Sequence, residues 1–336
     1  MKYGQNIRKF LGRSIQKNYW STCAYYLYKN FGASIKTKRT AAIKSDTGMT
    51  HKDKDISTSL AYVNTVFADY KKYGSVHRFH GRVAEVGTGD NCGVGLLFLS
   101  DGCDSVDLLD RFYYGNSQQQ AAIYGALIAQ ESFLKRKLHS ANLYDENSFD
   151  GITRYYGESA SAELFFREHK DYDFIVSRAV LEHIYDPSSA IMRMAGALTD
   201  GGMMLHEVDL RDHNMFSRHF HELKFYEVPD RMYYFMTKSA GYPNRVLINQ
   251  YHTIIQQTKL DYKFLITRLA GVGEIKPYIP YDEIPCPLRK ESLNYVRSVR
   301  KRFASSFASL SDEDLSITGF FLIAKNIGNT PPLRGQ

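Results

Sequence analysis

The sequence has little cysteine and no long apolar run. Its 336 residues include four cysteines, and no two of them stand in Cys-x-x-Cys spacing. This scarcity argues against a disulfide framework and a structural zinc site, and it favours a reducing cytoplasm. No uninterrupted apolar segment approaches the roughly 20 residues that span a bilayer. The basic N-terminus lacks the apolar core and cleavage site of a secretory signal, so we expect a cytoplasmic protein.

Internal repeats and low-complexity segments are also missing, which excludes solenoid and fibrous architectures. The composition is 43% hydrophobic and 24% charged, which is ordinary for a soluble globular protein. A chain of this length can bury a full α/β core.

Positive charge is concentrated at the N-terminus. Residues 1–54 contain twelve Lys or Arg against two Asp, although the net charge of the whole chain is only +7. The remainder is therefore nearly neutral, which argues against a nucleic-acid partner. Ile7, Leu11 and Ile15 recur every four residues among basic residues, so we expect a basic amphipathic helix. Such a helix suits the anionic inner face of a membrane, or it packs on its own domain or on a second subunit of a homo-oligomer.

Two sections of the chain are expected from this charge distribution. Residues 1–54 form a basic extension whose polar part, 34–54, we interpret as a linker. Residues 55–330 form the main domain, which opens with a helix at about 57–73 that ends at Gly74.

Apolar segments with strand character alternate with helical segments through most of the main domain. The strands are expected at 82–86, 105–110, 152–156, 172–177, 203–208, 262–269 and 317–324. The helices between them are expected at 94–100, 117–138, 187–198 and 293–307. This alternation predicts a doubly wound α/β fold with a mainly parallel sheet, to which the last strand is added antiparallel.

A glycine-rich turn follows the first expected strand. Gly87 and Gly89 satisfy the first two positions of a GxGxxG dinucleotide pattern, but Cys92 stands where the third glycine belongs. Glu85 precedes the turn and suits a cationic or hydrogen-bond-donating ligand group. Asp110 lies 21 residues after Gly89 at the end of the second strand, where an acid accepts hydrogen bonds from ribose hydroxyls.

Four separated motifs together resemble the class I S-adenosylmethionine-dependent methyltransferases over about residues 80–210. They are Glu-Val-Gly-Thr-Gly at 85–89, Asp110, Tyr-Asp-Phe-Ile-Val-Ser-Arg-Ala-Val-Leu-Glu-His at 172–183, and Leu-Thr-Asp-Gly-Gly at 198–202. The resemblance implies S-adenosylmethionine as the cofactor. It also implies a Rossmann-like sheet of seven strands, mostly parallel, with an antiparallel last strand.

The resemblance further implies which residues surround the cofactor. They are Glu85, Gly87, Gly89, Asn91, Cys92, Ser177 and Arg178 near the methionine, Asp110 and Arg111 at the ribose, and Ser161 and Ala162 at the adenine. The family often has Asp-Ala-Glu where this chain has Ser161-Ala162-Glu163, so Glu158 remains a rival for the adenine contact.

Methyl transfer from a sulfonium is an in-line displacement that depends mainly on positioning. A hydroxyl acceptor additionally needs a base, a role that histidine fills near neutral pH. Ionisable groups are dense after the fifth expected strand, so the catalytic candidates are His206, Asp209, Asp212 and His213. For the two aspartates, a salt-bridge network with Arg211 is the alternative interpretation.

A second ionisable pair, Glu182-His183, follows the fourth expected strand, and we interpret His183 as a pocket-wall or helix-start residue. The spacing of His213, His219 and His221 is not diagnostic of a metal site, and none is predicted.

Two features of the sequence restrict the chemical class of the acceptor substrate. The chain has no Asn-Pro-Pro-Tyr motif after the fourth strand, which argues against amino-methylation of nucleobases or glutamine. The aromatic segment 211–250 suits an inserted lid over a sugar, within a specificity region at 211–315.

The whole chain more loosely resembles bacterial methyltransferases of surface polysaccharide, which implies O-methylation of a sugar or glycan end in envelope polysaccharide biosynthesis. A small-molecule methyltransferase of secondary metabolism and a non-catalytic scaffold that binds S-adenosylmethionine remain alternatives.

Overall fold

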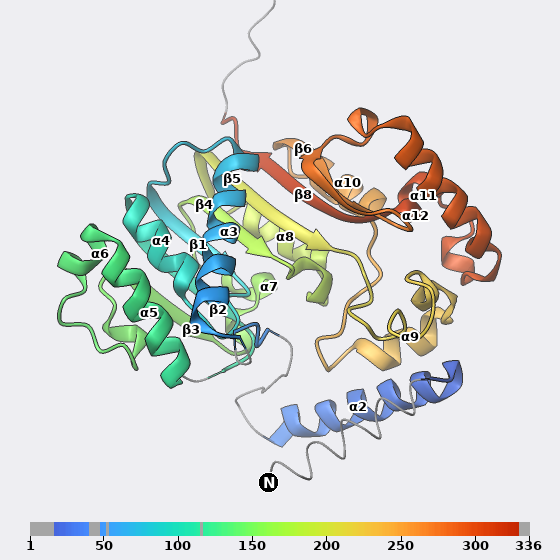
Figure 1. The fold of residues 1–336 in the computed structure, drawn as a ribbon, viewed down its shortest axis with the longest axis horizontal. Helices are drawn as coiled ribbons and strands as arrows, with labels where there is room; N and C mark the ends of the chain where they lie inside the picture. The colour runs from blue at the N-terminus through green and yellow to red at the C-terminus, as the bar shows by residue number, and fades with distance from the viewer. Residues whose placement is uncertain (1–16, 40–47, 52–53, 115–116, 329–336) are drawn as a thin grey trace, which may run out of the picture.

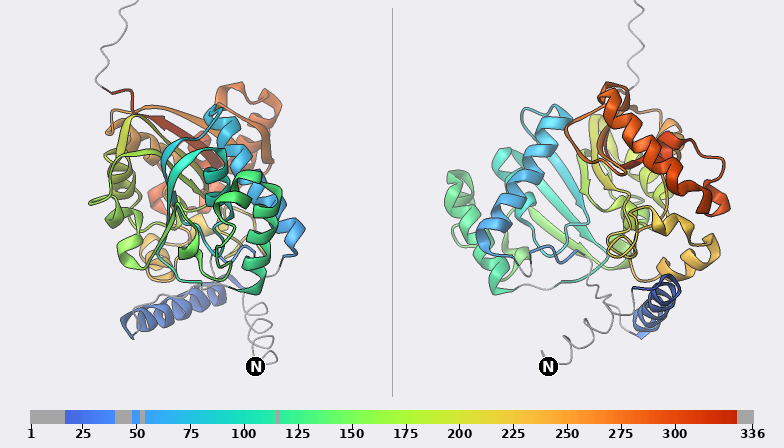
Figure 2. Two further views of the ribbon diagram at one scale, coloured as in Figure 1. Left: turned by 90° about the vertical axis from the view of Figure 1, so that its left-hand side faces the viewer. Right: turned by 45° about the vertical axis from the view of Figure 1, so that its right-hand side comes forward.

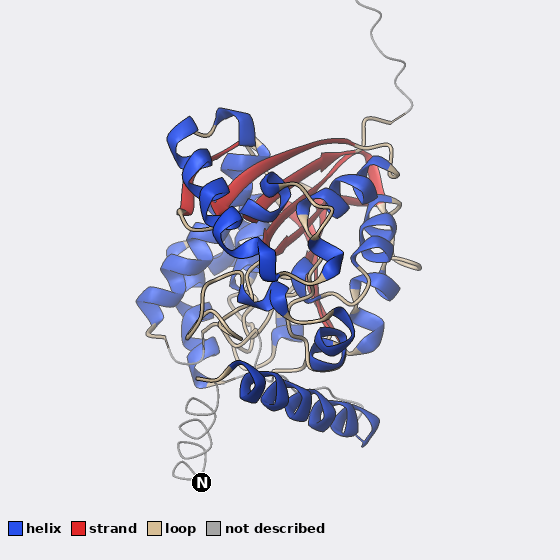
Figure 3. Cartoon of the chain, turned by 90° about the vertical axis from the view of Figure 1, so that its right-hand side faces the viewer, coloured by secondary structure: helices blue, strands red, loops and turns tan. Residues whose placement is uncertain are grey.

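A computed structural model describes residues 17–39, 48–51, 54–114 and 117–328, and shows one mixed β-sheet with helices on both faces (Figure 1, Figure 3). Among these residues the sheet has eight strands in the order β3-β2-β1-β4-β5-β8-β6-β7. The strands are β1 (Gly81–Val86), β2 (Cys103–Asp110), β3 (Ile152–Tyr156), β4 (Tyr172–Arg178), β5 (Leu198–Asp209), β6 (Asp261–Leu269), β7 (Gly273–Ile279) and β8 (Ile317–Lys325).

The predicted mainly parallel sheet with an antiparallel last strand is confirmed. β1 to β5 pair in parallel, and β8 lies antiparallel between β5 and β6. The eighth strand is β7, an edge strand that pairs antiparallel with β6. The sequence pattern missed it because Pro277 and charged residues interrupt its apolar positions, and proline in a sheet is confined to edges.

Two helical layers cover the sheet (Figure 2). The helices are α2 (Tyr19–Arg39), α3 (Ile56–Gly74), α4 (Gly93–Asp101), α5 (Gln118–Gln130), α6 (Ser132–Lys137), α7 (Ala162–Phe165), α8 (Pro187–Ala195), α9 (Asp230–Thr237), α10 (Ile248–Gln256), α11 (Cys286–Val299) and α12 (Asp312–Ser316). Helices α3 to α6 share one apolar core, and α7, α8, α10 and α11 share the other. Successive residues of β1 alternate between these cores, with Val83 in the first and Ala84 in the second.

Several helix boundaries differ from expectation. The helix expected at 117–138 is broken at Glu131, whose backbone is extended, so that α5 and α6 are separate. The helix expected at 293–307 begins earlier, at Cys286, because Pro287 stands in its first turn, where a missing N–H costs nothing.

Helix α2 of the N-terminal extension packs against the aromatic segment 211–250. Helix α2 lies along α9 (Figure 1), and the Asn30 side chain bonds to one backbone group in α9 and one just after it, donating to Phe235 O at 2.8 Å and accepting from Ser239 N at 2.7 Å. The linker expected at 34–54 is shorter, since α2 continues to Arg39. The amphipathic helix expected around Ile7 to Ile15 lies outside the described residues. None of the helices in the described part is both long and apolar enough to cross a bilayer.

Candidate active site

The glycine turn joins the end of β1 to the start of α4. Gly87 and Gly89 have φ values of 73° and 67°, which only glycine adopts without strain. A Cβ at Gly87 would lie 2.3 Å from Val180 Cγ2, and one at Gly89 would lie 2.5 Å from the Gly48 carbonyl oxygen. Both positions therefore require glycine for conformation and for space.

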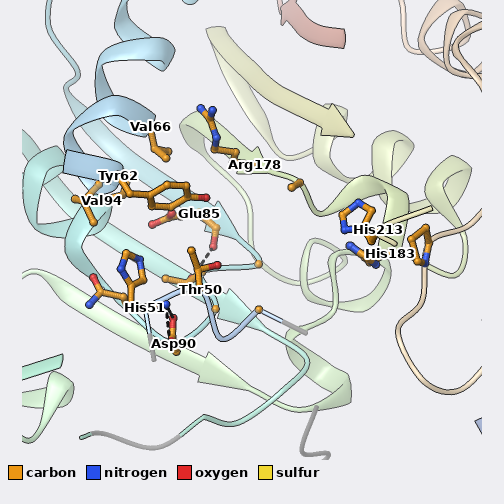
Figure 4. Close-up of a pocket in the computed structure, with 18 of the residues that line it drawn as sticks. Thr50, His51, Tyr62, Val66, Glu85, Asp90, Val94, Arg178, His183 and His213 are labelled. Atoms are coloured by element: carbon orange, nitrogen blue, oxygen red, sulfur yellow. Dashed lines mark hydrogen bonds between the residues drawn. The ribbon is translucent and has the colours of Figure 1, made fainter. Parts of the chain in front are cut away.

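Two adjoining cavities lie on this turn. The first, of about 290 Å³, extends from Glu85 and the turn to His183 and His213. Figure 4 shows the two histidines together at one end, with Glu85, Tyr62 and His51 toward the other. The second, of about 120 Å³, lies beside Asp110 and Arg111 at the end of β2. The two cavities share lining residues, among them Gly87 and His183, so they form one elongated cleft.

Three buried polar atoms of residues that line the first cavity have no hydrogen-bond partner among the described residues. They are Glu85 Oε2, an acceptor, Asn91 Nδ2, a donor, and His51 Nδ1. Burial raises the pKa of Glu85 to about 8. An acceptor and a donor left open together suit a ligand that carries an ammonium and a carboxylate, as the methionine part of S-adenosylmethionine does.

Asp110 is buried at the boundary of the second cavity. Its carboxylate accepts hydrogen bonds from the backbone N–H groups of Gly89 and Phe112, both at 2.8 Å. Burial raises its pKa although these bonds favour the charged form. The carboxylate keeps further lone pairs for a ribose.

The adenine candidates lie in the same second cavity. Ser161, Ala162 and Glu163 line it, whereas Glu158 does not line it and its side chain is 60% exposed. The geometry therefore favours residues 161–163 over Glu158 for the adenine contact.

Nine of the eleven residues predicted to surround the cofactor line the cleft, and two do not. Cys92 is completely buried, and its backbone N–H donates to Tyr124 Oη at 3.1 Å. Ser177 is completely buried beside His206. Arg178 does line the first cavity, but its guanidinium is paired with Asp69 and Glu207, each at 2.8 Å. The cofactor roles of these residues stay predictions.

The four catalytic candidates separate into two groups. His213 lines the first cavity, and Asp209 Oδ2 lies 3.8 Å from its Nε2. His206 is completely buried in β5, where its Nδ1 lies 2.8 Å from Ser177 Oγ and burial lowers its pKa to about 3. A base must reach its substrate, and His206 lines neither cavity.

Asp212 and Asp209 both take part in local structure. The buried Asp212 carboxylate accepts hydrogen bonds from the backbone N–H groups of Asn214, Phe216 and Ser217, so it shapes the loop after β5. Asp209 pairs with Arg211 at 2.5 Å. Of the alternative salt-bridge network, the pair of Asp209 with Arg211 is present, whereas Asp212 shapes the loop through hydrogen bonds from backbone N–H groups.

A three-residue cluster lies at the histidine end of the first cavity, where two of its members, His183 and His213, line the wall. Glu182 and His183 come from the 3₁₀ helix Leu181–His183 after β4, and His213 comes from the loop after β5. Glu182 Oε1 lies 3.6 Å from His213 Nε2. Burial lowers the pKa of His213, but the Glu182 and Asp209 carboxylates outweigh it and raise that pKa overall. Burial raises the pKa of Glu182 and lowers that of His183 to about 3.

Sequence reasoning missed part of the wall of the cleft. Gly48 to His51, from the expected linker, lie over the glycine turn, where His51 N donates to the Asp90 carboxylate at 3.2 Å and Gly48 O accepts from Asp90 N at 3.2 Å. Tyr26 of α2 also lines the first cavity, although the extension was not expected to reach it, whereas Tyr242 belongs to the aromatic segment 211–250 that was expected near the acceptor. No periodicity marks these residues, because their positions depend on how the extension folds back.

Comparison with known proteins identifies the domain family of this chain. A family model described as a methyltransferase domain matches residues 64–240, more than half of the chain. No curated protein matches. Among solved structures, similarity is found to phosphoethanolamine N-methyltransferase 2 from Haemonchus contortus, crystallised with S-adenosylmethionine, at 16% identity and a TM-score of 0.41, covering 79% of this chain and 53% of that one.

Other solved structures are similarly distant. The YcgJ protein from Bacillus subtilis has 12% identity and a TM-score of 0.40, covering 80% of this chain and 99% of that one. A SAM-dependent methyltransferase from Archaeoglobus fulgidus has 12% identity and a TM-score of 0.38, covering 78% and 94%. This chain thus spans about half the length of the Haemonchus enzyme and nearly all of the other two.

The fold is that of a class I methyltransferase, a class of enzyme that takes its methyl group from the sulfonium of S-adenosylmethionine. The chain belongs to the methyltransferase domain family matched above.

Proposed function

We propose that this protein transfers a methyl group from S-adenosylmethionine to a hydroxyl oxygen of a sugar or glycan end. The observation that carries the proposal is the Glu182–His183–His213 cluster, of which His183 and His213 line the first cavity. A hydroxyl must lose its proton on methylation, so ionisable groups are needed beside it.

Different residues of the cleft position different parts of the cofactor. In this proposal Glu85 and Asn91 hold the ammonium and carboxylate of the methionine, and Asp110 holds the ribose. The sulfonium then faces the histidine end of the first cavity. Such alignment supplies most of the rate enhancement in an in-line displacement.

Aromatic side chains beside the histidines support a sugar acceptor. Tyr26 and Tyr242 line the first cavity, with ring centroids 4.9 Å apart in a T-shaped arrangement. Aromatic faces with a few fixed polar groups are typical of ligand pockets and suit the C–H face of a sugar ring. We assign residues 1–54 to a basic extension and linker, residues 55–330 to the methyltransferase domain, and 211–315 to substrate specificity.

The outer face of α2 supports a place at the inner membrane surface, as expected for envelope polysaccharide assembly. Trp20, Tyr28, Phe31 and Ile35 are exposed, and their spacing puts them on one side of the helix, opposite its packed face. Aromatic residues with neighbouring positive charge favour an anionic bilayer surface. Co-sedimentation with anionic vesicles, absent with neutral ones and lost in a Trp20→Ser/Phe31→Ser variant, tests this placement. Equal sedimentation of the variant would contradict it.

The test of the activity uses the full chain, S-adenosylmethionine, and a panel of nucleotide sugars, oligosaccharides and small phenols. Mass spectrometry should show a gain of one methyl group on a sugar product. Transfer only to a phenol would favour a small-molecule methyltransferase. Calorimetry that detects no binding of S-adenosylmethionine would support the scaffold alternative instead.

A further inference from the structure

Glu182 is a buried acidic residue whose carboxylate is not stabilised by hydrogen bonds from the described residues. Its side chain is completely buried, and neither carboxylate oxygen has a hydrogen-bond partner among them. Burying an ionised carboxylate without a paired charge is costly, so such groups are protonated, paired with a cation or bound to a metal. The nearest cationic candidate is His213, whose Nε2 lies 3.6 Å from Oε1, beyond hydrogen-bond distance.

His183 is oriented as a metal-binding imidazole would be. Its Nδ1 lies 2.9 Å from the Gly241 carbonyl oxygen, which accepts only from an N–H. The proton is therefore on Nδ1, and Nε2 presents a lone pair. Metal-ligating histidines commonly donate their other ring N–H to a backbone carbonyl in this way. The ring of His213 lies beside it, with centroids 4.7 Å apart.

We propose that Glu182, His183 and His213 bind one divalent transition-metal ion of the Mn²⁺ or Zn²⁺ type. One donor atom from each residue lies within 4.8 Å of the others, so small side-chain movements bring all three onto one ion. Two imidazoles and one carboxylate suit such ions better than Mg²⁺ or Ca²⁺, which prefer all-oxygen sites. Asp209 Oδ2 lies 3.8 Å from His213 Nε2, but Asp209 is already paired with Arg211, so it is not counted among the metal ligands.

The ion's role rests on the proposed function. Three protein ligands leave positions open toward the first cavity, which His183 and His213 line. Adjacent hydroxyls of a sugar can occupy them, and a cation lowers the pKa of a coordinated hydroxyl. The O–H bond then breaks and its proton goes to water. The oxygen's lone pair forms the new O–CH₃ bond while the S–CH₃ bond breaks, leaving its electron pair on sulfur.

Metal binding is measured on the full chain after chelator treatment, by calorimetry with MnCl₂ or ZnCl₂ alone and by the spin-resonance signal of Mn²⁺. One site per chain is expected. Glu182→Gln, His183→Phe and His213→Ala should each weaken it at least tenfold. The matched control is His219→Ala, since His219 is an exposed histidine in the same loop region and outside the cluster.

Folding of each variant is checked by thermal unfolding and by binding of S-adenosylmethionine. His213 is exposed, so its replacement should keep the fold and give a clear answer even where Glu182→Gln does not fold. Absence of a site in the native chain, or equal binding by native protein and His213→Ala, would overturn the metal assignment.

The experiments distinguish a failure of the metal assignment from a failure of the proposed methyl transfer. Metal bound at this cluster without methyl transfer to any sugar would refute the proposed activity and leave the site standing. Full transfer by the metal-free protein would refute the ion's catalytic role and leave the activity standing.

Discussion

The Asp110 carboxylate accepts a hydrogen bond of 2.8 Å from the backbone N–H of Gly89. The acid that ends β2 is therefore fixed to the turn that ends β1, and a second bond from Phe112 N holds its other oxygen. The acidic side chain is held at the cleft before any ribose arrives, so little side-chain entropy remains to be lost on binding.

Replacing Asp110 by Ala should weaken binding of S-adenosylmethionine by about 1–3 kcal/mol, since buried hydrogen bonds to the ribose are lost. Calorimetry measures the change. Asp110→Asn, which keeps the side chain's shape, should lose less. The exposed Asp150 provides a control, since Asp150→Ala should bind normally. Unchanged affinity in Asp110→Ala would remove the ribose assignment.

Gly87→Ala should destabilise the protein more than Gly157→Ala. Both glycines have positive φ, 73° and 93°, so both substitutions add backbone strain of about 1–3 kcal/mol. Only at Gly87 would the new Cβ meet a neighbour, Val180 Cγ2 at 2.3 Å, which adds about 1–3 kcal/mol of overpacking. Urea unfolding compares the two variants.

Adding Val180→Ala to the Gly87→Ala variant should recover the part of the lost unfolding free energy that comes from overpacking. The part that comes from backbone strain should remain lost. Equal free energies of unfolding for Gly87→Ala and Gly157→Ala would show that the contact with Val180 is unimportant.

Glu85 should make the ligand-free protein less stable as pH rises. Its folded pKa of about 8 lies above the ordinary 4.5, so the folded chain holds a proton that the unfolded chain loses between these values. The free energy of unfolding therefore falls across that range, and Glu85→Gln should flatten the fall. Urea unfolding at pH 6 and pH 8 measures both slopes, and identical slopes would contradict the assignment.

The same residue should also affect cofactor binding. Affinity for S-adenosylmethionine should rise from pH 6 to pH 8 as Glu85 becomes charged and pairs with the ammonium. Glu85→Gln should remove this rise and weaken binding at pH 8 by about 1.5–3 kcal/mol, the range for a hydrogen bond to a charged group. A variant that keeps the full pH dependence would place the ammonium elsewhere.

His213→Asn should lower turnover about a hundredfold or more, because His213 is at the acceptor end of the cleft. His206→Asn should instead lower the free energy of unfolding by about 1–3 kcal/mol, since His206 is buried and bonded to Ser177. Turnover and urea unfolding of both variants give the comparison. If His206→Asn lowered turnover while His213→Asn lowered only the free energy of unfolding, His206 would be the base.

Much of the fold was predictable because its signals are local. The alternation of apolar segments with helical ones located every strand except β7. The glycine-rich turn was recognisable because Gly87 and Gly89 have positive φ, which favours glycine. α10 was missed although Ile248, Tyr251 and Ile255 recur at helical spacing. In α9, Tyr233 and Met236 recur at the same spacing, but the helix has only eight residues.

The candidate site was predictable only in part. The cofactor side follows from strand ends and a turn, which the sequence marks directly, and most of the predicted residues line the cleft. The acceptor side depends on which side chains of separate loops meet. His206 and His213 stand seven residues apart in one ionisable run, yet one is sealed inside the sheet and the other faces the cavity.

The sequence by itself determined the class of fold and the methyl donor, because apolar periodicity, turn glycines and a strand-end acid act over short stretches of chain. Only the tertiary structure decided that the buried Glu182 faces His213 across 31 residues of sequence, and that Tyr26 of the extension reaches the same cavity. Burial and the direction of a side chain are set by the packing of neighbouring elements, and no local pattern encodes them.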